Sequence, residues 1–211
     1  MKKIKTAFIM GEHPYDVPYF QQMFNLIEEI EIYPQSLEMF ATSPKKSREM
    51  YDVVIFYNFH MKTPAKGSVE KTAMEELGNN GQGILILHHA LLAYPDWPLW
   101  SEICGIGNRK FGYYPNEQVP CHIEKSGHPI TAGLSDFVIT DETYTMDEPG
   151  DGSEILITTN NKNSMKNIGW IRQYKKSKVF CYESGHDNDV YSDKNFREII
   201  KRASLWLAER S

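Results

Sequence analysis

Short, uninterrupted apolar runs separated by amphipathic segments constrain the fold of this chain more than any other feature of its sequence. Such runs occupy Ile4–Met10, Asp52–Asn58 and Ile84–Leu87. Between them, apolar residues recur at every third or fourth position after Val17 and after Ser68, which is the spacing of a helix with one apolar face. Strands that are apolar on both faces are typical of a parallel sheet covered by helices on both sides. The sequence therefore predicts an α/β fold with a parallel sheet between two layers of helices.

The remaining segments are less regular. Leu37–Ala41 is expected to form a further strand, Gly107–Pro120 a loop and Asn195–Glu209 the last helix. A short helix is expected within Pro95–Gly105, and further strands are expected at Val119–Lys125, Phe137–Met146, Glu154–Thr159, Ile168–Tyr174 and Lys178–Glu183. The 211 residues are enough for one sizeable core, so we expect a single domain over residues 1–211.

Composition argues against several classes of partner. The chain has 23 basic and 28 acidic side chains and no basic stripe, so we expect no nucleic-acid partner. No apolar run approaches the roughly 20 residues of a membrane span, so we expect a cytoplasmic protein with no membrane partner. The three cysteines are far apart and form no Cys-x-x-Cys pair, and we expect them to be reduced.

Histidines follow several of the predicted strands. His13 follows the first apolar run, Asn58 ends the second, His88 and His89 end the third, and His186 follows the last strand. Because ligands bind beyond the carboxyl ends of parallel strands, we expect these side chains to share one cleft. An imidazole in such a cleft can transfer a proton near neutral pH or bind zinc.

A carboxylate is expected to complete this cleft. Asp141 and Glu142 are adjacent in a predicted strand, and neighbouring residues of a strand point to opposite faces, so only one of them is expected to enter. The same reasoning predicts that one of His88 and His89 faces the cleft while the other packs. We expect His88 and Glu142 to be the two that enter.

The expected site has three sets of residues. The expected catalytic residues are His88, His186 and Glu142. The residues expected to bind substrate are His13, Asn58, His89, Trp170 and Asp187. Zinc or another divalent metal is a candidate cofactor, with ligands His13, His88 and His186. Structural roles stay open for an exposed His13, a packed or surface His89, a solvated Glu142 and a core Trp170.

Several motifs of nucleotide and acyl chemistry are missing from the sequence. It has no glycine-rich dinucleotide fingerprint, no Gly-Lys-Ser/Thr phosphate loop and no Gly-x-Ser-x-Gly elbow. Nucleotide cofactors therefore have no support in the sequence.

A series of short motifs runs along nearly the whole chain. The motifs are Asp52-Val-Val-Ile-Phe56, Gly81-x-Gly83, Leu87-His88-His89-Ala90, His128-Pro-Ile-Thr-Ala-Gly133, Asp141-Glu142-x-Tyr144, Trp170, Val179-Phe180 and Gly185-His186-Asp187. Each motif is weak alone, but the ordered series resembles the ThuA-like, trehalose-utilisation family. The resemblance implies a flavodoxin-like, class I glutamine amidotransferase-like fold and a role in the catabolism of disaccharides and other sugars.

One departure from the amidotransferase pattern bears on the chemistry. Amidotransferases carry a nucleophilic cysteine at a strand-to-helix elbow, and the matching segment here, Leu87–Ala90, has none. An imidazole at that place cannot form the thioester that a cysteine thiolate makes, and Cys104 is distant along the chain. We therefore expect no glutamine hydrolysis.

Two functional hypotheses remain, together with a structural one. The first is an enzyme that acts on a sugar or oxidised sugar derivative by proton transfer next to a carbonyl, as an isomerase, lyase or hydrolase, with or without a metal. The second is a non-catalytic sugar-binding or regulatory protein. The third is a homo-oligomer whose interface uses an aromatic surface around Trp97 and Trp100.

Overall fold

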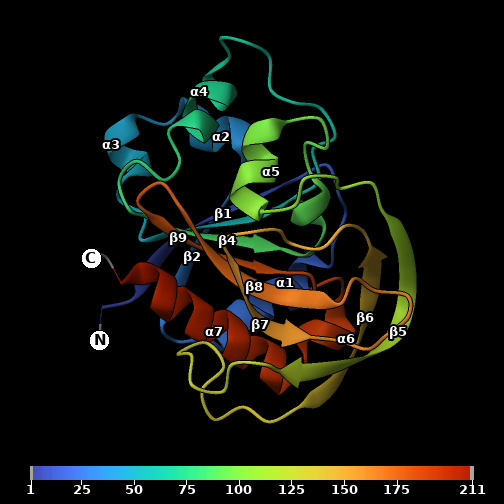
Figure 1. Ribbon diagram of the computed structural model, residues 1–211. Helices are drawn as coiled ribbons and strands as arrows, with labels where there is room; N and C mark the ends of the chain where they lie inside the picture. Colours follow the sequence, from blue (N-terminus) through green and yellow to red (C-terminus); the bar gives the residue numbers. More distant parts are fainter. Residues whose placement is uncertain (1, 210–211) are drawn as a thin grey trace.

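The polypeptide forms a nine-stranded sheet with helices on both faces, as the computed structural model shows for residues 2–209 (Figure 1). The strands are β1 Ile4–Gly11, β2 Ile30–Ser36, β3 Val53–Asn58, β4 Gly83–Leu87, β5 Gly112–Ile123, β6 Phe137–Thr145, β7 Ser153–Thr158, β8 Asn167–Tyr174 and β9 Ser177–Tyr182. Their order across the sheet is β2-β1-β3-β4-β9-β8-β7-β5-β6. The predicted α/β class is confirmed.

The parallel arrangement predicted for the sheet holds for only part of it. β2, β1, β3, β4 and β9 run parallel to one another, in the 2-1-3-4-5 order of doubly wound sheets. β9, β8, β7, β5 and β6 are joined by antiparallel pairings. We refer to the first five strands as the parallel half and to β5–β8 as the antiparallel half. The difference follows from short connections along the chain, because β8 and β9 form a hairpin and β5 pairs directly with β6.

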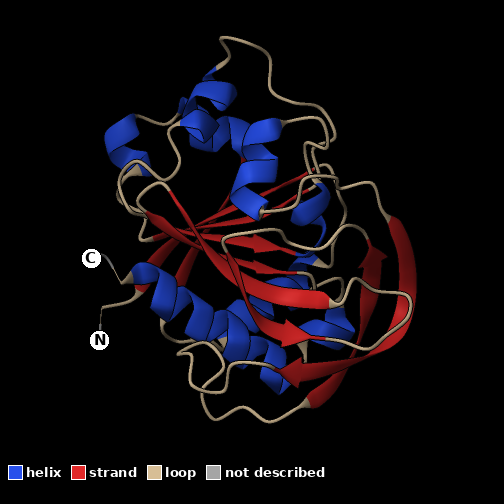
Figure 2. Cartoon of the chain, in the orientation of Figure 1, coloured by secondary structure: helices blue, strands red, loops and turns tan. Residues whose placement is uncertain are grey.

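Helices cover the two faces of the parallel half as two layers (Figure 2). One layer holds α2 Leu37–Thr42, α3 Lys45–Arg48, α4 Val69–Glu75 and α5 Pro98–Cys104. The other layer holds α1 Val17–Asn25, α6 Asn188–Tyr191 and α7 Lys194–Ala208. Every residue of β3 and β4 is buried between the layers, which explains why both strands are apolar without alternation.

α7 packs against β4 through a glycine. A Cβ atom on Gly83 would lie 2.5 Å from Leu207 Cβ and 2.6 Å from the Leu207 carbonyl oxygen, so only glycine allows this approach of helix and strand. The apolar stripe predicted for the last helix, with Phe196 and Ile199 among its members, is buried.

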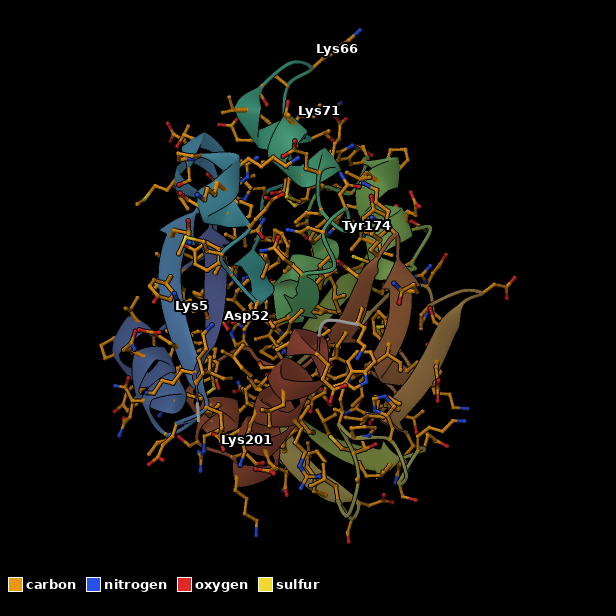
Figure 3. The ribbon with its side chains drawn as sticks, turned by 90° about the vertical axis from the view of Figure 1, so that its left-hand side faces the viewer. Lys5, Asp52, Lys66, Lys71, Tyr174 and Lys201 are labelled. Carbon is orange, nitrogen blue, oxygen red and sulfur yellow. The ribbon has the colours of Figure 1, made fainter. Side chains whose placement is uncertain are left out.

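Lys5, Asp52 and Lys201, labelled in Figure 3, lie at the amino-terminal edge of the sheet. There the amide of Lys5 on β1 donates to Asp52 Oδ2 at 3.0 Å, just before β3 begins. Lys201 on α7 forms an ion pair with Glu29 at 3.1 Å. The histidines follow β1, β4 and β9 and therefore lie at the opposite, carboxyl edge of the parallel half.

Two predicted segments have a different structure. Leu37–Ala41 lies in helix α2 rather than in a strand, because Ser36 Oγ accepts from the Met39 amide and caps the helix. Gly107–Pro120 is not a loop throughout, because β5 begins at Gly112. Its polar residues form the more exposed strand of an antiparallel ribbon with β6, and no period-two apolar pattern marks that strand in the sequence.

The aromatic interface predicted around Trp97 and Trp100 is wrong. Trp97 is 6% exposed and Trp100 is 0% exposed, and both rings pack on Tyr94 inside the helix layer that includes α5. Cys104, Cys121 and Cys181 are free and buried, as expected. Among the described residues, no helix is long and apolar enough to cross a membrane.

Candidate active site

The carboxyl edge of the parallel half brings the predicted histidines together. His13 follows β1, His88 and His89 follow β4, and His186 follows β9. The His13 and His89 rings stack with centroids 4.3 Å apart, while the His88 and His186 centroids are 5.2 Å apart. The expected histidine cluster is confirmed.

A sharp turn after β4 directs both members of the histidine pair toward the cluster. β4 ends at Leu87, and the 3-10 helix η1, His88–Leu92, begins immediately. His88 has a φ of 52°, in the left-handed region that few residues other than glycine adopt. The expectation of one inward and one packed imidazole assumed an extended backbone, whereas this turn brings both rings against other cluster members. His89, which was expected to pack, lines the pocket, whereas His88, which was expected to enter it, is 0% exposed and is not among the lining residues. His88 lies instead at the centre of the polar contacts.

The tautomer of neutral His88 follows from its partners. Its Nδ1 lies 2.8 Å from the Glu183 carbonyl oxygen, which can only accept, so Nδ1 carries the proton and donates. Nε2 therefore carries a lone pair, and it lies 3.2 Å from His186 Nδ1 and 2.8 Å from the Tyr144 hydroxyl. Burial lowers the pKa of His88, outweighing the interaction with Glu142, which raises it. His88 is thus held as a neutral imidazole with a lone pair at the centre of the cluster.

Glu142 supplies the carboxylate from the antiparallel half. Its Oε1 lies 3.7 Å from His88 Nε2, 3.6 Å from His186 Nδ1 and 2.8 Å from the Tyr144 hydroxyl, whose single proton serves either Glu142 Oε1 or His88 Nε2. Burial acts to raise its pKa, but the interactions with His88, Tyr144 and His186 together hold the pKa at about 2. Glu142 is therefore ionised near neutral pH.

Asp141, next to Glu142, connects β6 to the loop after β9. Its Oδ1 accepts from the amides of Glu142 and His186 at 2.9 and 3.0 Å, and its Oδ2 accepts from the Gly185 amide at 2.8 Å. Burial raises the pKa of Asp141 to about 7 against these hydrogen bonds. As expected from strand alternation, Glu142 faces the cluster while Asp141 points elsewhere; here it positions the backbone that carries His186.

The His13 and His89 pair forms a second part of the cluster. His89 Nε2 donates to the Tyr57 carbonyl oxygen at 3.0 Å, and its Nδ1 is buried without a hydrogen-bond partner. Burial, together with the neighbouring His88 and His13, lowers the pKa of His89 to about 2. This imidazole is neutral near pH 7.

A pocket of about 320 Å³ opens beside these groups. It is lined by His13, Phe59, His89, Leu92, Phe111, Tyr113, Glu142 and Tyr144. Aromatic rings next to a few polar groups are a common lining for small-molecule sites, and apolar ring faces stack on sugars.

Three residues predicted to bind substrate lie outside the pocket lining. Asn58 is buried, and its Nδ2 donates to the Tyr94 hydroxyl at 3.0 Å. Trp170 is 0% exposed, and its Nε1 donates to the Cys104 carbonyl oxygen at 2.9 Å, so it belongs to the core. Asp187 caps α6 by accepting from the Asp189 amide. In the structure, the side chains of these three residues form hydrogen bonds within the protein and do not line the pocket.

Some lining residues were not predicted. Tyr144 could have been found, because it lies two positions after Glu142 in a strand and therefore on the same face. Phe111 and Tyr113 belong to the segment predicted as a loop, and only the pairing of β5 with β6 brings them to the site.

Three donor atoms lie close enough to hold one metal ion. His88 Nε2, Glu142 Oε1 and His186 Nδ1 are within 4.8 Å of one another. Glu142 thus occupies the third place in the set, where the sequence predicted His13. His13 stacks on His89 instead.

The fold and the site define a class: an α/β protein with a histidine and glutamate centre at the carboxyl edge of a doubly wound sheet. The model of the ThuA family, described as trehalose utilisation, matches residues 14–207. The chain belongs to this family.

Solved structures share the fold at low sequence identity. A ThuA-like protein from Parabacteroides merdae matches 99% of this chain and 91% of its own, with a TM-score of 0.78 and 18% identity. A cytoplasmic protein from Salmonella typhimurium matches 95% of this chain and 98% of its own, with a TM-score of 0.67 and 14% identity. A protein from Thermoplasma acidophilum, described as part of a GMP synthase, matches 99% and 96% with a TM-score of 0.57 and 7% identity. No curated protein sequence matches the chain.

Proposed function

We propose that this protein is an enzyme of carbohydrate catabolism that acts on a sugar or an oxidised sugar derivative. Its catalytic centre comprises His88, His186 and Glu142. The observation that carries the proposal is the convergence of these three side chains within 4.8 Å, next to a pocket of about 320 Å³. Membership of a family described as trehalose utilisation supports the substrate class.

The proposed chemistry is proton transfer next to a sugar carbonyl, as in enolisation, isomerisation or elimination. Such reactions need a neutral base or a Lewis acid near the carbonyl and a group that carries the proton away. The neutral His88 with its Nε2 lone pair, and the ionised Glu142 beside it, are in the protonation states that this chemistry requires. The aromatic lining would hold the sugar ring against the centre.

Glutamine hydrolysis is not part of the proposal. The fold likeness to a protein described as part of a GMP synthase supports a flavodoxin-like, class I amidotransferase-like arrangement in which η1 occupies the elbow. This turn contains no cysteine, and Cys104 is buried on α5 and does not line the pocket. A thiolate nucleophile is therefore missing from the place where such an enzyme uses it.

The test follows proton exchange as well as product formation. Disaccharides and their keto derivatives are incubated with the protein in D₂O, and NMR follows deuterium uptake at the carbon next to the carbonyl. We expect His88→Ala and His186→Ala to slow exchange and turnover by about 10²–10⁴-fold, the usual contribution of such groups. His122→Ala, on exposed β5, is the control and should change neither. Unchanged turnover of every active sugar in both site variants would refute the proposal.

A non-catalytic sugar-binding or regulatory protein is the alternative. The aromatic lining favours it, because ring stacking alone can hold a sugar. Sugar binding that survives His88→Ala and His186→Ala, with no exchange and no product, would support this alternative over the enzyme.

A further inference from the structure

We propose that His88, His186 and Glu142 bind a first-row divalent cation, such as zinc, with one coordination position open to the pocket. The inference rests on the proposed function for its substrate. It deepens that proposal by assigning the group that would contact the sugar oxygen.

The three donor atoms have the spacing of a tetrahedral site. The sides of their triangle are 3.2 Å from His88 Nε2 to His186 Nδ1, 3.6 Å from His186 Nδ1 to Glu142 Oε1, and 3.7 Å from Glu142 Oε1 to His88 Nε2. Two ligands about 2.0–2.1 Å from zinc at a tetrahedral angle lie about 3.3 Å apart. Small side-chain movements would therefore bring all three atoms to ligand distance.

The hydrogen bonds behind the triangle prepare His88 as a ligand. Its Nδ1–H donates to the Glu183 carbonyl oxygen at 2.8 Å, which leaves the Nε2 lone pair directed at the other two donors. A ligating histidine in metalloproteins almost always donates its second ring N–H to such an acceptor. Burial of His88 at 0% exposure means that solvent does not compete for this lone pair.

The ligands come from two halves of the molecule that a second carboxylate connects. Asp141 binds the backbone amides of both Glu142 and His186, so it fixes the relative positions of two of the three donors. Two imidazoles with one carboxylate suit zinc and similar ions, and a site with three protein ligands keeps a position for water or substrate.

We assign the open position to the side of Glu142, which is the one donor of the three that belongs to the pocket lining. Glu142 belongs to the pocket lining, as does Tyr144, whose hydroxyl lies 2.8 Å from both His88 Nε2 and Glu142 Oε1. A sugar carbonyl or hydroxyl oxygen that enters there would meet the cation. Coordination would withdraw electrons from a carbonyl and make the hydrogen on the neighbouring carbon more acidic. Because the His88 lone pair would then be bound to the cation, the proton would pass to His13, an imidazole of the pocket lining outside the ligand set.

The first experiment measures metal in protein purified without chelators and without a histidine tag. Elemental analysis should find about one equivalent of zinc or a similar ion. After metal removal, titration with Co²⁺ should produce the visible absorption of a tetrahedral site. Glu142→Gln and His186→Ala are expected to weaken Zn²⁺ and Co²⁺ binding at least tenfold, whereas His13→Ala should bind both ions as the wild type does. Circular dichroism confirms folding of each variant.

The outcomes separate this inference from the proposed function. Failure of the wild type to bind Zn²⁺ or Co²⁺ at micromolar concentrations, or full sugar turnover by the demonstrably metal-free protein, would overturn the inference and leave the proposed enzyme in place. Equal loss of metal in His13→Ala and Glu142→Gln would overturn the ligand set. Stoichiometric metal in a protein that turns over no sugar would uphold the inference and count against the proposed function.

Discussion

The two halves of the sheet make different contributions to one site. The parallel half has fully buried central strands, and the turns after β1, β4 and β9 carry the four imidazoles. The antiparallel half is more exposed along β5, and it supplies Glu142 and most of the aromatic lining. The scaffold thus fixes the histidines, while the ribbon of β5 and β6 provides the carboxylate and shapes the pocket. Contacts between the halves should therefore affect catalysis, and contacts within either half should affect stability.

Of the variants that test this comparison, Asp141→Asn should have the largest effect, because Asp141 joins the halves. Asparagine places an NH₂ group where the carboxylate accepts from backbone amides, so at least one of the bonds to Gly185, His186 and Glu142 is lost. We expect kcat, or metal affinity, to fall about 10–100-fold with KM little changed, as is usual when a group that orients a ligand is removed. Steady-state kinetics and Co²⁺ titration measure the two effects. Asp136→Asn, on the exposed end of the same ribbon, is the control, and equal losses in both variants would contradict the assigned role.

Trp170→Phe tests whether a core residue of β8 has any direct part in binding. The change removes the hydrogen bond to the Cys104 carbonyl oxygen and leaves that buried oxygen with only the weak Cys181 Sγ–H donor at 3.8 Å. We expect a loss of about 2–3 kcal/mol in the free energy of unfolding, measured by urea denaturation. KM for the sugar should stay the same. A raised KM at unchanged stability would instead support the substrate-binding role that the sequence suggested.

A pair of glycine substitutions compares how tightly the two halves pack. In Gly83→Ala, the new methyl group meets the backbone of α7 at 2.6 Å, and we expect a cost of about 1–3 kcal/mol in the free energy of unfolding. In Gly169→Ala, on β8, the new methyl group lies 3.1 Å from Ile157 Cβ, a looser contact than the one at Gly83. Its cost should be below about 1 kcal/mol. Similar urea midpoints for the two variants would show that the two halves pack equally tightly around these glycines.

Tyr113→Ala should have the smallest effect. Tyr113 is 64% exposed on β5 but also lines the pocket, so its ring can contact a bound sugar without supporting the core. Loss of one stacking contact, worth about 0.5–1.5 kcal/mol, should raise KM about 2–10-fold. The free energy of unfolding should change by less than about 0.5 kcal/mol. Val138→Ala, on the exposed face of β6, is the control and should leave KM unchanged.

The sequence predicted the parallel half better than the antiparallel half, for physical reasons. β3 and β4 are buried on both faces, so their apolar runs are visible without any knowledge of the fold. β5 is largely exposed and has a register shift between Tyr114 and Glu117, so it has no regular apolar alternation.

The candidate site was also predicted only in part from the sequence. Strand ends identified His88 and His186 because the carboxyl edge follows from the order of the elements. The orientation of His89 depended on a left-handed φ at His88, and no pattern in Leu87–Ala90 indicates a left-handed turn at a histidine. The sequence placed Asp141 in a strand beside Glu142. Its hydrogen bond to the Gly185 amide joins residues 44 positions apart and follows only from the fold.

The hydrogen bonds of Asp141 to the loop after β9 have a consequence for redesign. It holds amide groups of the main chain, and every residue except proline offers the same amide at position 186. Asp141 should therefore hold the backbone of this loop in the same conformation whichever side chain stands at position 186. His186→Cys or His186→Asp would present a thiolate or a carboxylate from the same backbone position, so the chemistry of the centre can be exchanged while its architecture is retained.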